Sequence, residues 1–258
     1  MKFIILTLFP EMYDSFLSTS ILKRAIGKKL IQIQLVNIRD YTEDKHGRVD
    51  TPPIGGGAGL IMKCQPIIDA LRKNSTANSH KIILLPRGKT FTQEKAQKLS
   101  NEQEIVIMCG HYEGFDERIY QYFDESISIG DFILTGGETA SFCMIDSISR
   151  LIKNVISEDS TKEESFVDGL LEYPQYTEPY DFENKLVPQI LYSGNHIAIN
   201  KYHKKQSIKI TRIYRPDLFQ KYKCTNKDLL LIKELNDGVV PKWESNAIEK
   251  GSKFTKNH

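Results

Sequence analysis

Short apolar runs that alternate with helical stretches constrain the fold of the first 150 residues more than any other feature. The runs at 3–9, 82–85 and 105–109 are continuous and bounded by turn residues, as is typical of strands buried in a parallel sheet. Residues 31–38 alternate apolar and polar side chains, which predicts a half-buried strand, and 126–134 predicts a further short one. Helical patterns lie between these strands, at 66–74 and 93–100. The alternation predicts an α/β fold for this part of the chain.

The rest of the chain has a different character. The segment SEDSTKEE, at 157–164, is polar and acidic without an apolar anchor, which predicts a mobile linker. After it, strand signals nearly vanish and helix signals replace them. Asn195 and Thr225 are candidate N-caps, Pro216 is placed to open a helix, and Gly238 is placed to end one.

These signals divide the chain into three parts. We expect an α/β domain over 1–156, a flexible interdomain linker over 157–167 and a small helical domain over 168–258, with a disordered tail after Pro241. No apolar run reaches the roughly 18 residues of a membrane span, so we expect no membrane partner. The four cysteines form no CxxC pair, which argues against a zinc or redox motif and fits a cytoplasmic protein.

Three glycine-bearing segments are candidate ligand sites. They lie at 53–59, 109–116 and 128–138, and the second directly follows an apolar run. Glycine lets the backbone approach a ligand closely, and α/β sheets bind ligands in loops at the carboxyl ends of their strands. None of the segments has the full spacing of GxGxxG or GxxxxGK[ST], which argues against an ordinary dinucleotide enzyme and a phosphate-loop ATPase. Simple tight turns are the alternative, above all for the first segment.

Long sequence blocks in a fixed order point to one family. The chain contains, in order, LFPEMYDSF, RDYTEDKHGRVDTPPIGGGAGLIM, CGHYEGFDER, SIGDFILTGGE, DSISRLI, GLLEYPQYTEP and VPQILYSGNH. Over roughly residues 1–235 these blocks resemble those of the bacterial tRNA (guanine-N1)-methyltransferases, the TrmD family. The resemblance implies S-adenosylmethionine-dependent methylation of N1 of the guanine at position 37 in the tRNA anticodon loop. It also implies a SPOUT fold, an α/β domain with a trefoil knot and a small C-terminal helical domain, in a homodimer whose nucleic-acid partner is tRNA and not DNA.

The resemblance further implies that three loops hold the cofactor, S-adenosylmethionine. Close approach of the backbone would offer N–H and C=O groups to the adenine edge, and apolar side chains would enclose the ring. The implied cofactor-binding residues are Leu84, Leu85, Pro86, Gly110, Tyr112, Glu113, Gly114, Ser128, Ile129, Gly130, Phe132, Leu134, Gly136 and Gly137.

Methylation of guanine N1 makes two chemical demands. The N1 proton must leave, and charge that develops on O6 must be stabilised. The resemblance implies that Glu164 is the base and that Arg150 stabilises the oxygen. It places two further carboxylates, Glu113 and Glu172, near the site.

The residues alone leave alternatives for these roles. Arg150 is also compatible with a surface arginine, and Glu164 is also compatible with a solvated acid in an acidic loop. Three neighbours of Glu164 compete for the role of base: Glu158, Asp159 and Glu163.

The chain departs from the family pattern at several positions. His111, Glu178 and Ile210 stand where the family has arginine, Ala140 replaces a proline, and Glu164 replaces an aspartate. Loss of arginines is expected to weaken or redirect contacts with RNA. A divergent SPOUT paralogue that methylates another RNA or a small molecule is therefore one alternative, and an RNA-binding relative without catalysis is another. The retained cofactor-loop glycines argue against the second alternative.

A basic segment is the candidate RNA-binding surface. The net charge of +2 is too small to indicate a nucleic-acid partner, but residues 200–227 hold nine lysines and arginines and a single acid, with tyrosines between them. A solvated helix face is the alternative. We expect RNA contacts from Lys201, Lys204, Lys205, Arg212 and Arg215. The family implies magnesium in catalysis, although the sequence has no visible cluster of metal ligands.

Overall fold

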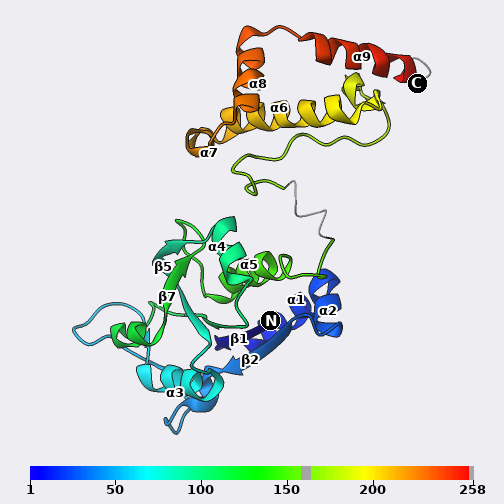
Figure 1. The fold of residues 1–258 in the computed structure, drawn as a ribbon. Helices are drawn as coiled ribbons and strands as arrows, with labels where there is room; N and C mark the ends of the chain where they lie inside the picture. The colour runs from blue at the N-terminus through cyan, green and yellow to red at the C-terminus, as the bar shows by residue number, and fades with distance from the viewer. Residues whose placement is uncertain (158–163, 256–258) are drawn as a thin grey trace. The chain divides into compact units, whose positions relative to one another are not determined.

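The computed structural model describes residues 1–157 and 164–255. The chain divides into two compact units, Met1–Glu158 and Asp159–His258 (Figure 1). Part of the predicted linker, 158–163, and the last three residues, 256–258, lie outside the described residues. No helix within the described ranges is long and apolar enough to cross a membrane.

A sheet of five parallel strands forms the centre of the first unit (Figure 1). Its strand order is β2-β1-β6-β5-β7. The strands are β1 (Lys2–Thr7), β2 (Gln32–Asn37), β5 (His80–Thr90), β6 (Glu104–Met108) and β7 (Glu125–Ser128). The predicted α/β fold with a parallel sheet is therefore confirmed.

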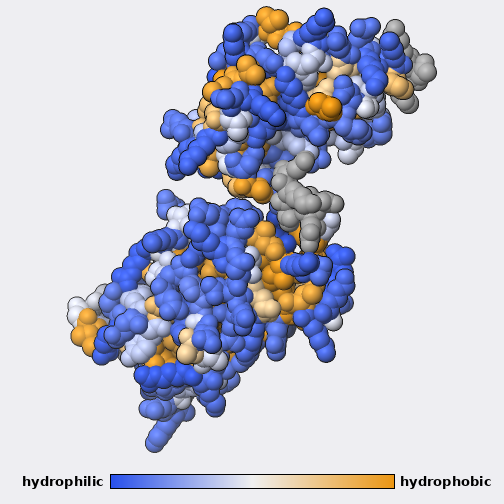
Figure 2. Space-filling model, viewed as in Figure 1, coloured by the Kyte–Doolittle hydropathy of each residue, from blue (hydrophilic) through white to orange (hydrophobic). Residues whose placement is uncertain are grey.

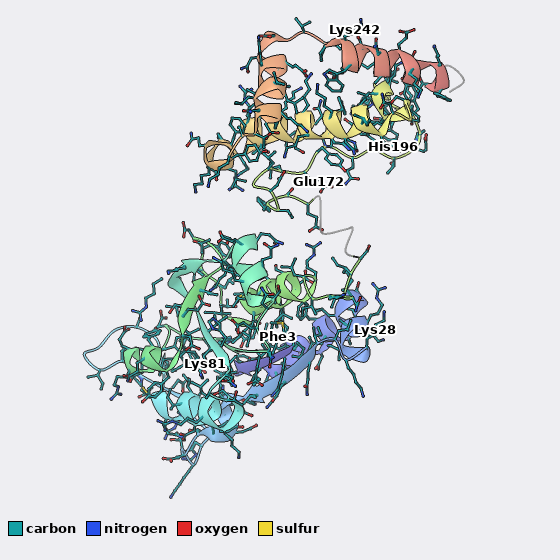
Figure 3. All side chains as sticks on the ribbon, viewed as in Figure 1. Phe3, Lys28, Lys81, Glu172, His196 and Lys242 are labelled. Carbon is teal, nitrogen blue, oxygen red and sulfur yellow. The ribbon has the colours of Figure 1, made fainter. Side chains whose placement is uncertain are left out.

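Apolar layers cover both faces of this sheet, which explains why its strands read as continuous apolar runs. On β1, Phe3 (labelled in Figure 3) and Ile5 belong to one core cluster, whereas Ile4 and Leu6 belong to the other. The first cluster is completed by side chains of α2 (Ser20–Gly27), α4 (Gln93–Leu99) and α5 (Glu138–Ser149). The second is completed by α3 (Cys64–Asn74).

Shorter elements complete the first unit. They are the 3-10 helices Pro10–Tyr13, Ile38–Tyr41 and Glu117–Tyr122, the single turn α1 (Asp14–Leu17) and an antiparallel pair, β3 (Asp50–Thr51) with β4 (Ile61–Met62). The strand predicted over 126–134 is wrong in its second half, because β7 ends at Ser128 and the chain leaves the sheet there.

The pairing of β5 with β7 is interrupted after Leu84. Leu84 and Lys89 both face Ile127, so the residues between them loop out of the sheet. A Cβ atom on Gly88 would lie 2.5 Å from the backbone of Ile127, a distance that real Cβ atoms do not adopt. A glycine at this position therefore lets the looped segment, which begins with Leu84, pass directly over β7.

The second unit is mainly helical. Its helices are α6 (His196–Tyr214), α7 (Pro216–Lys221), α8 (Asn226–Asp237) and α9 (Lys242–Thr255), and it also has a short hairpin, β8 (Asp181–Phe182) with β9 (Lys185–Leu186), and the 3-10 helix Gln189–Tyr192. The predicted caps are confirmed. The Asn195 side chain accepts from Ala198 N, Thr225 forms a capping box, and Gly238 ends α8 in a left-handed conformation.

The prediction of a disordered tail after Pro241 is wrong, because α9 occupies most of that segment. Ala247 is buried, and Gly251 packs so closely on Gln189 that a Cβ atom could not fit. Small residues at helical spacing hold α9 against the 3-10 helix that precedes α6. Such residues give little hydrophobic signal, which explains why the sequence pattern did not reveal the helix.

Candidate active site

A cavity of about 530 Å³ lies beside the interruption of β5 and the carboxyl ends of β6 and β7 in the first unit. It is walled by the looped part of β5, which begins with Leu84, and by the segments that follow β6 and β7. The carboxyl ends of parallel strands are where α/β sheets form ligand sites. The volume falls within the roughly 300–1,000 Å³ typical of small-molecule sites. The structure brings all of the sequence-predicted cofactor residues together around it: Leu84, Leu85, Pro86, Gly110, Tyr112, Glu113, Gly114, Ser128, Ile129, Gly130, Phe132, Leu134, Gly136 and Gly137.

Glycines let two of the cavity's walls approach each other. Gly137 N donates to Gly110 O at 2.8 Å, and a Cβ atom on Gly137 would lie 2.7 Å from Cys109 Cα. A Cβ atom on Gly110 would lie 2.4 Å from the ring of Phe115. The segment after β7 therefore lies against the segment after β6 with no room for a side chain at either glycine.

The segment after β7 presents apolar side chains beside backbone polar groups. Phe132, Ile133 and Leu134 are all exposed, and Ile133 is 81% exposed. Gly130 adopts a φ of 152° and its N–H donates to Ser128 Oγ at 3.2 Å. An exposed apolar cluster next to ordered backbone groups suits a planar ligand with a hydrogen-bonding edge.

A buried network beneath the cavity was not predicted from the sequence. Glu138, the first residue of α5, is 1% exposed. Thr7 Oγ1 donates to its Oε1 at 2.5 Å, and His111 Nε2 lies 2.6 Å from its Oε2. The only sequence signal for Glu138 is its place directly after the glycine pair of the third segment.

Two further features of the cavity bear on its chemistry. Arg87 lies in the cavity wall with its guanidinium 3.9 Å from the centre of the Tyr120 ring and 2.8 Å from Glu117 Oε1. Beneath the wall, burial raises the pKa of the Cys109 thiol to about 12, so this cysteine remains protonated at neutral pH. Cys109 is therefore unsuited to act as a covalent nucleophile.

The proposed catalytic residues fall in different parts of the chain. Glu113 lines the cavity of the first unit, and its side chain lies where a Cβ atom on Gly59 would have to be. This contact joins the first glycine segment to the second. Arg150 is half-buried in the same unit and caps the C-terminal end of α5.

Glu164 and Glu172 line a second, smaller cavity of about 240 Å³ in the second unit. Figure 3 labels Glu172, which lies on the segment that precedes α6. Ser165 Oγ accepts from Glu172 N at 3.0 Å, which closes this segment into a compact turn. The rings of Tyr173 and His203 stack at 3.7 Å and also line the cavity. The competing carboxylates Glu158, Asp159 and Glu163 lie outside the described residues.

The basic segment contains one residue that cannot serve as predicted. Lys205 is 5% exposed and its ammonium lies 2.6 Å from Glu244 and 3.4 Å from Glu234. Lys205 is therefore unsuited to contact RNA, because binding a phosphate would require breaking a buried ion pair. Lys201 pairs with Glu234, and Lys204 pairs with Asp168.

The two remaining cations of the expected set have exposed partners. Arg215 pairs with Asp217, and Arg212 donates to Asn236. Exposed partners of this kind can be exchanged for phosphate at little cost.

The magnesium that the family implies has no ready-made cluster of protein ligands among the described residues. Within 1–157 and 164–255, no group of three or more His, Cys, Asp or Glu side chains is placed to hold a metal ion.

A parallel sheet with a glycine-bearing cavity beside three of its strands is typical of an α/β enzyme domain that binds a small molecule. Over residues 1–221, the chain matches the family described as tRNA (Guanine-1)-methyltransferase TrmD. It is 54% identical over 235 residues to a tRNA (guanine-N(1)-)-methyltransferase of Clostridium perfringens (strain 13 / Type A), covering 90% of this chain and 99% of the relative. It is 52% identical over 238 residues to the enzyme of the same description from Clostridium botulinum (strain Langeland / NCTC 10281 / Type F), covering 92% and 99%. The chain belongs to the TrmD family, as the sequence blocks predicted.

Proposed function

We propose that this protein transfers the methyl group of S-adenosylmethionine to N1 of guanine in tRNA, at position 37 of the anticodon loop. The observation that carries the proposal is the cavity of the first unit. Fourteen residues predicted from the family pattern converge on it from the looped part of β5 and from the segments after β6 and β7. Family membership supplies the reaction type, and relatives named for guanine-N1 methylation match along nearly their whole length.

The cavity's own residues suit this cofactor. Gly110, Gly130 and Gly137 line the cavity, so backbone groups form part of its wall. Leu84, Ile129 and Leu134 line the same cavity and would enclose the adenine ring. When bound, S-adenosylmethionine supplies an electrophilic methyl group on a sulfonium.

The protein's catalytic task is then to make guanine N1 nucleophilic. We propose that the carboxylate of Glu164 takes the N1 proton and that the Arg150 guanidinium stabilises the charge that develops on O6. Glu172 shares a cavity with Glu164, which supports a role for Glu172 in orienting the Glu164 carboxylate. Glu113 lines the cofactor cavity, which supports a role next to the donor.

We further propose that two copies of the chain form a dimer through the face that α1 and α5 share. Figure 2 shows apolar surface there on the first unit. Phe16 and Phe142 stack at 4.5 Å, and Leu151, Ile152 and Val155 are partly buried against the same core cluster. A continuous apolar face of this kind is typical of an interface between subunits.

The SPOUT trefoil knot belongs to the same proposal. Two close backbone passages support it. The looped residue Gly88 passes over β7, and Gly137 passes over the end of β6. Glycines at these positions let the crossing segments lie in direct backbone contact, as a tightly wound chain crossing needs.

For RNA binding we propose a revised surface. Arg212, Lys209 and Lys221 are exposed, and so are Lys223 and Lys227. These side chains come from α6, α7, the connection between α7 and α8, and the start of α8, and they carry the positive charge that phosphates require.

Mass mapping of methylated nucleosides tests the proposed function. Purified protein is incubated with S-adenosylmethionine and an unmodified tRNA transcript that carries guanine at position 37. The matched control is the same transcript with adenine there. We expect 1-methylguanine at position 37 of the first transcript and no methylation of the second. Methylation of another nucleotide, or none in the presence of bound cofactor, would refute the proposal.

A further inference from the structure

The mechanism above leaves the buried pair of His111 and Glu138 without a role. Glu138 is 1% exposed, and the side chain of His111 is 15% exposed in the wall of the cofactor cavity. A buried carboxylate is costly unless its oxygens are hydrogen-bonded, and here Thr7 satisfies one oxygen and His111 the other. The arrangement is that of a histidine oriented by a buried acid, next to a ligand cavity.

The hydrogen bonds determine which nitrogen of His111 carries a proton. Phe9 N donates to Thr7 Oγ1, so the Thr7 hydroxyl is free to give its own hydrogen to Glu138. A carboxylate only accepts hydrogen bonds, so Nε2 of His111 must be its N–H. In the neutral ring, Nδ1 is then a hydrogen-bond acceptor.

Nδ1 is also the only ring nitrogen that a ligand can reach. Among the described residues none bonds to Nδ1, and this atom is not one of the buried side-chain atoms without a partner. The ring itself is held firmly. Phe9 packs edge-on at 4.7 Å, and a Cβ atom on Gly136 would lie 2.3 Å from Cε1 of His111. His111 therefore presents a fixed acceptor to the cavity.

We propose that His111 is a cofactor-binding residue whose Nδ1 accepts a hydrogen bond from the nucleoside part of S-adenosylmethionine, and that Glu138 is the positioning residue that fixes its tautomer. The nucleoside offers neutral hydroxyl and amino donors. The ammonium of the methionine part is matched instead by the carboxylates of Glu113 and Glu117, which line the same cavity. This inference rests on the proposed cofactor site.

The test is calorimetric binding of two ligands, S-adenosylmethionine and 5′-methylthioadenosine, which keeps the nucleoside and lacks the amino acid. In Glu138→Gln the amide oxygen is favoured on the side of Thr7 Oγ1, which already accepts from Phe9 N and has a hydrogen to donate. The amide N–H then faces Nε2, which favours the opposite tautomer and turns Nδ1 into a donor. We expect the Kd of both ligands to rise about tenfold or more, as for the loss of one hydrogen bond at a buried site. His111→Leu should weaken binding similarly, whereas His111→Gln should stay within about threefold because its amide keeps one donor and one acceptor.

A second histidine–glutamate pair in the same unit provides the matched control. His80 Nε2 lies 2.6 Å from Glu125 Oε1, and neither residue lines the cavity. Glu125, which also pairs with Lys95, lies outside the cavity lining, so Glu125→Gln should leave the Kd of both ligands within about twofold of the wild-type value.

Each outcome separates the inference from the function on which it rests. A wild-type protein that does not bind S-adenosylmethionine would refute the proposed function itself. Wild-type binding that Glu138→Gln and His111→Leu leave unchanged would refute the inference alone. An effect limited to S-adenosylmethionine would overturn the assignment to the nucleoside. If His111→Gln and His111→Leu lose the same amount of ligand affinity, His111 contributes only packing and the inference is wrong. Comparison of these two variants tests the inference even if Glu138→Gln does not fold.

Discussion

Substituting Gly137 by alanine tests how far the cofactor cavity depends on close backbone approach. The added Cβ would lie 2.7 Å from Cys109 Cα and 2.9 Å from Gly110 N, whereas ordinary contacts begin at 3.4 Å. The segment after β7 must therefore retreat by about 0.7 Å, since backbone atoms cannot swing aside as a flexible side chain can. That shift would stretch the 2.8 Å hydrogen bond from Gly137 N to Gly110 O to about 3.5 Å, beyond its useful range.

Both effects lower the affinity for S-adenosylmethionine. Overpacking and the lost hydrogen bond lower the stability of the free protein by about 2–4 kcal/mol. The displaced wall also costs the ligand about one or two hydrogen bonds, which corresponds to about a tenfold to hundredfold rise in Kd. Calorimetry measures the Kd, and thermal melting confirms folding. Gly27→Ala is the control, because nothing lies within 4 Å of its added Cβ. A folded Gly137→Ala protein with a Kd within twofold of the wild type would show that the close passage does not shape the site.

Three further predictions concern the second unit, the base and the dimer. Lys205→Met should lower the free energy of unfolding by about 3–5 kcal/mol in a denaturant titration, because it leaves Glu244 buried without its partner. Lys209 is exposed, so Lys209→Met should change the free energy of unfolding by less than about 0.5 kcal/mol. If both variants melt alike, the buried ion pair does not stabilise the unit. Glu164→Gln should abolish most single-turnover methylation while S-adenosylmethionine still binds, whereas Glu164→Asp should remain active. Near-normal turnover in Glu164→Gln would show that another residue is the general base. Phe142→Glu should convert the dimer to monomer in light scattering, and an unchanged mass would place the interface on another face.

The sequence predicted those features that depend on local pattern. Continuous apolar runs give the strands of the buried sheet because both faces of a parallel sheet are covered, and cap residues such as Thr225 act within a few positions of themselves. The pattern could not separate Lys205 from Lys209, because burial of Lys205 depends on acids of α8 and α9 far along the chain. The role of Glu138 was hidden for the same reason, since its partners come from the end of β1 and the loop after β6.

The departure from the family pattern at His111 can be interpreted only together with Glu138, to which His111 is hydrogen-bonded. Read in the sequence, the exchange of arginine for His111 suggested a weaker contact with RNA. In the structure the side chain at this position forms a hydrogen bond with Glu138. Both a guanidinium and an imidazole can donate a hydrogen bond to a buried carboxylate. The two differ in what remains for the cavity, because arginine offers only donors whereas histidine with Nε2 engaged offers an acceptor. On this argument the exchange preserves the buried pair and alters the contact with the methyl donor, so its consequences should be sought in cofactor affinity before they are sought in tRNA binding.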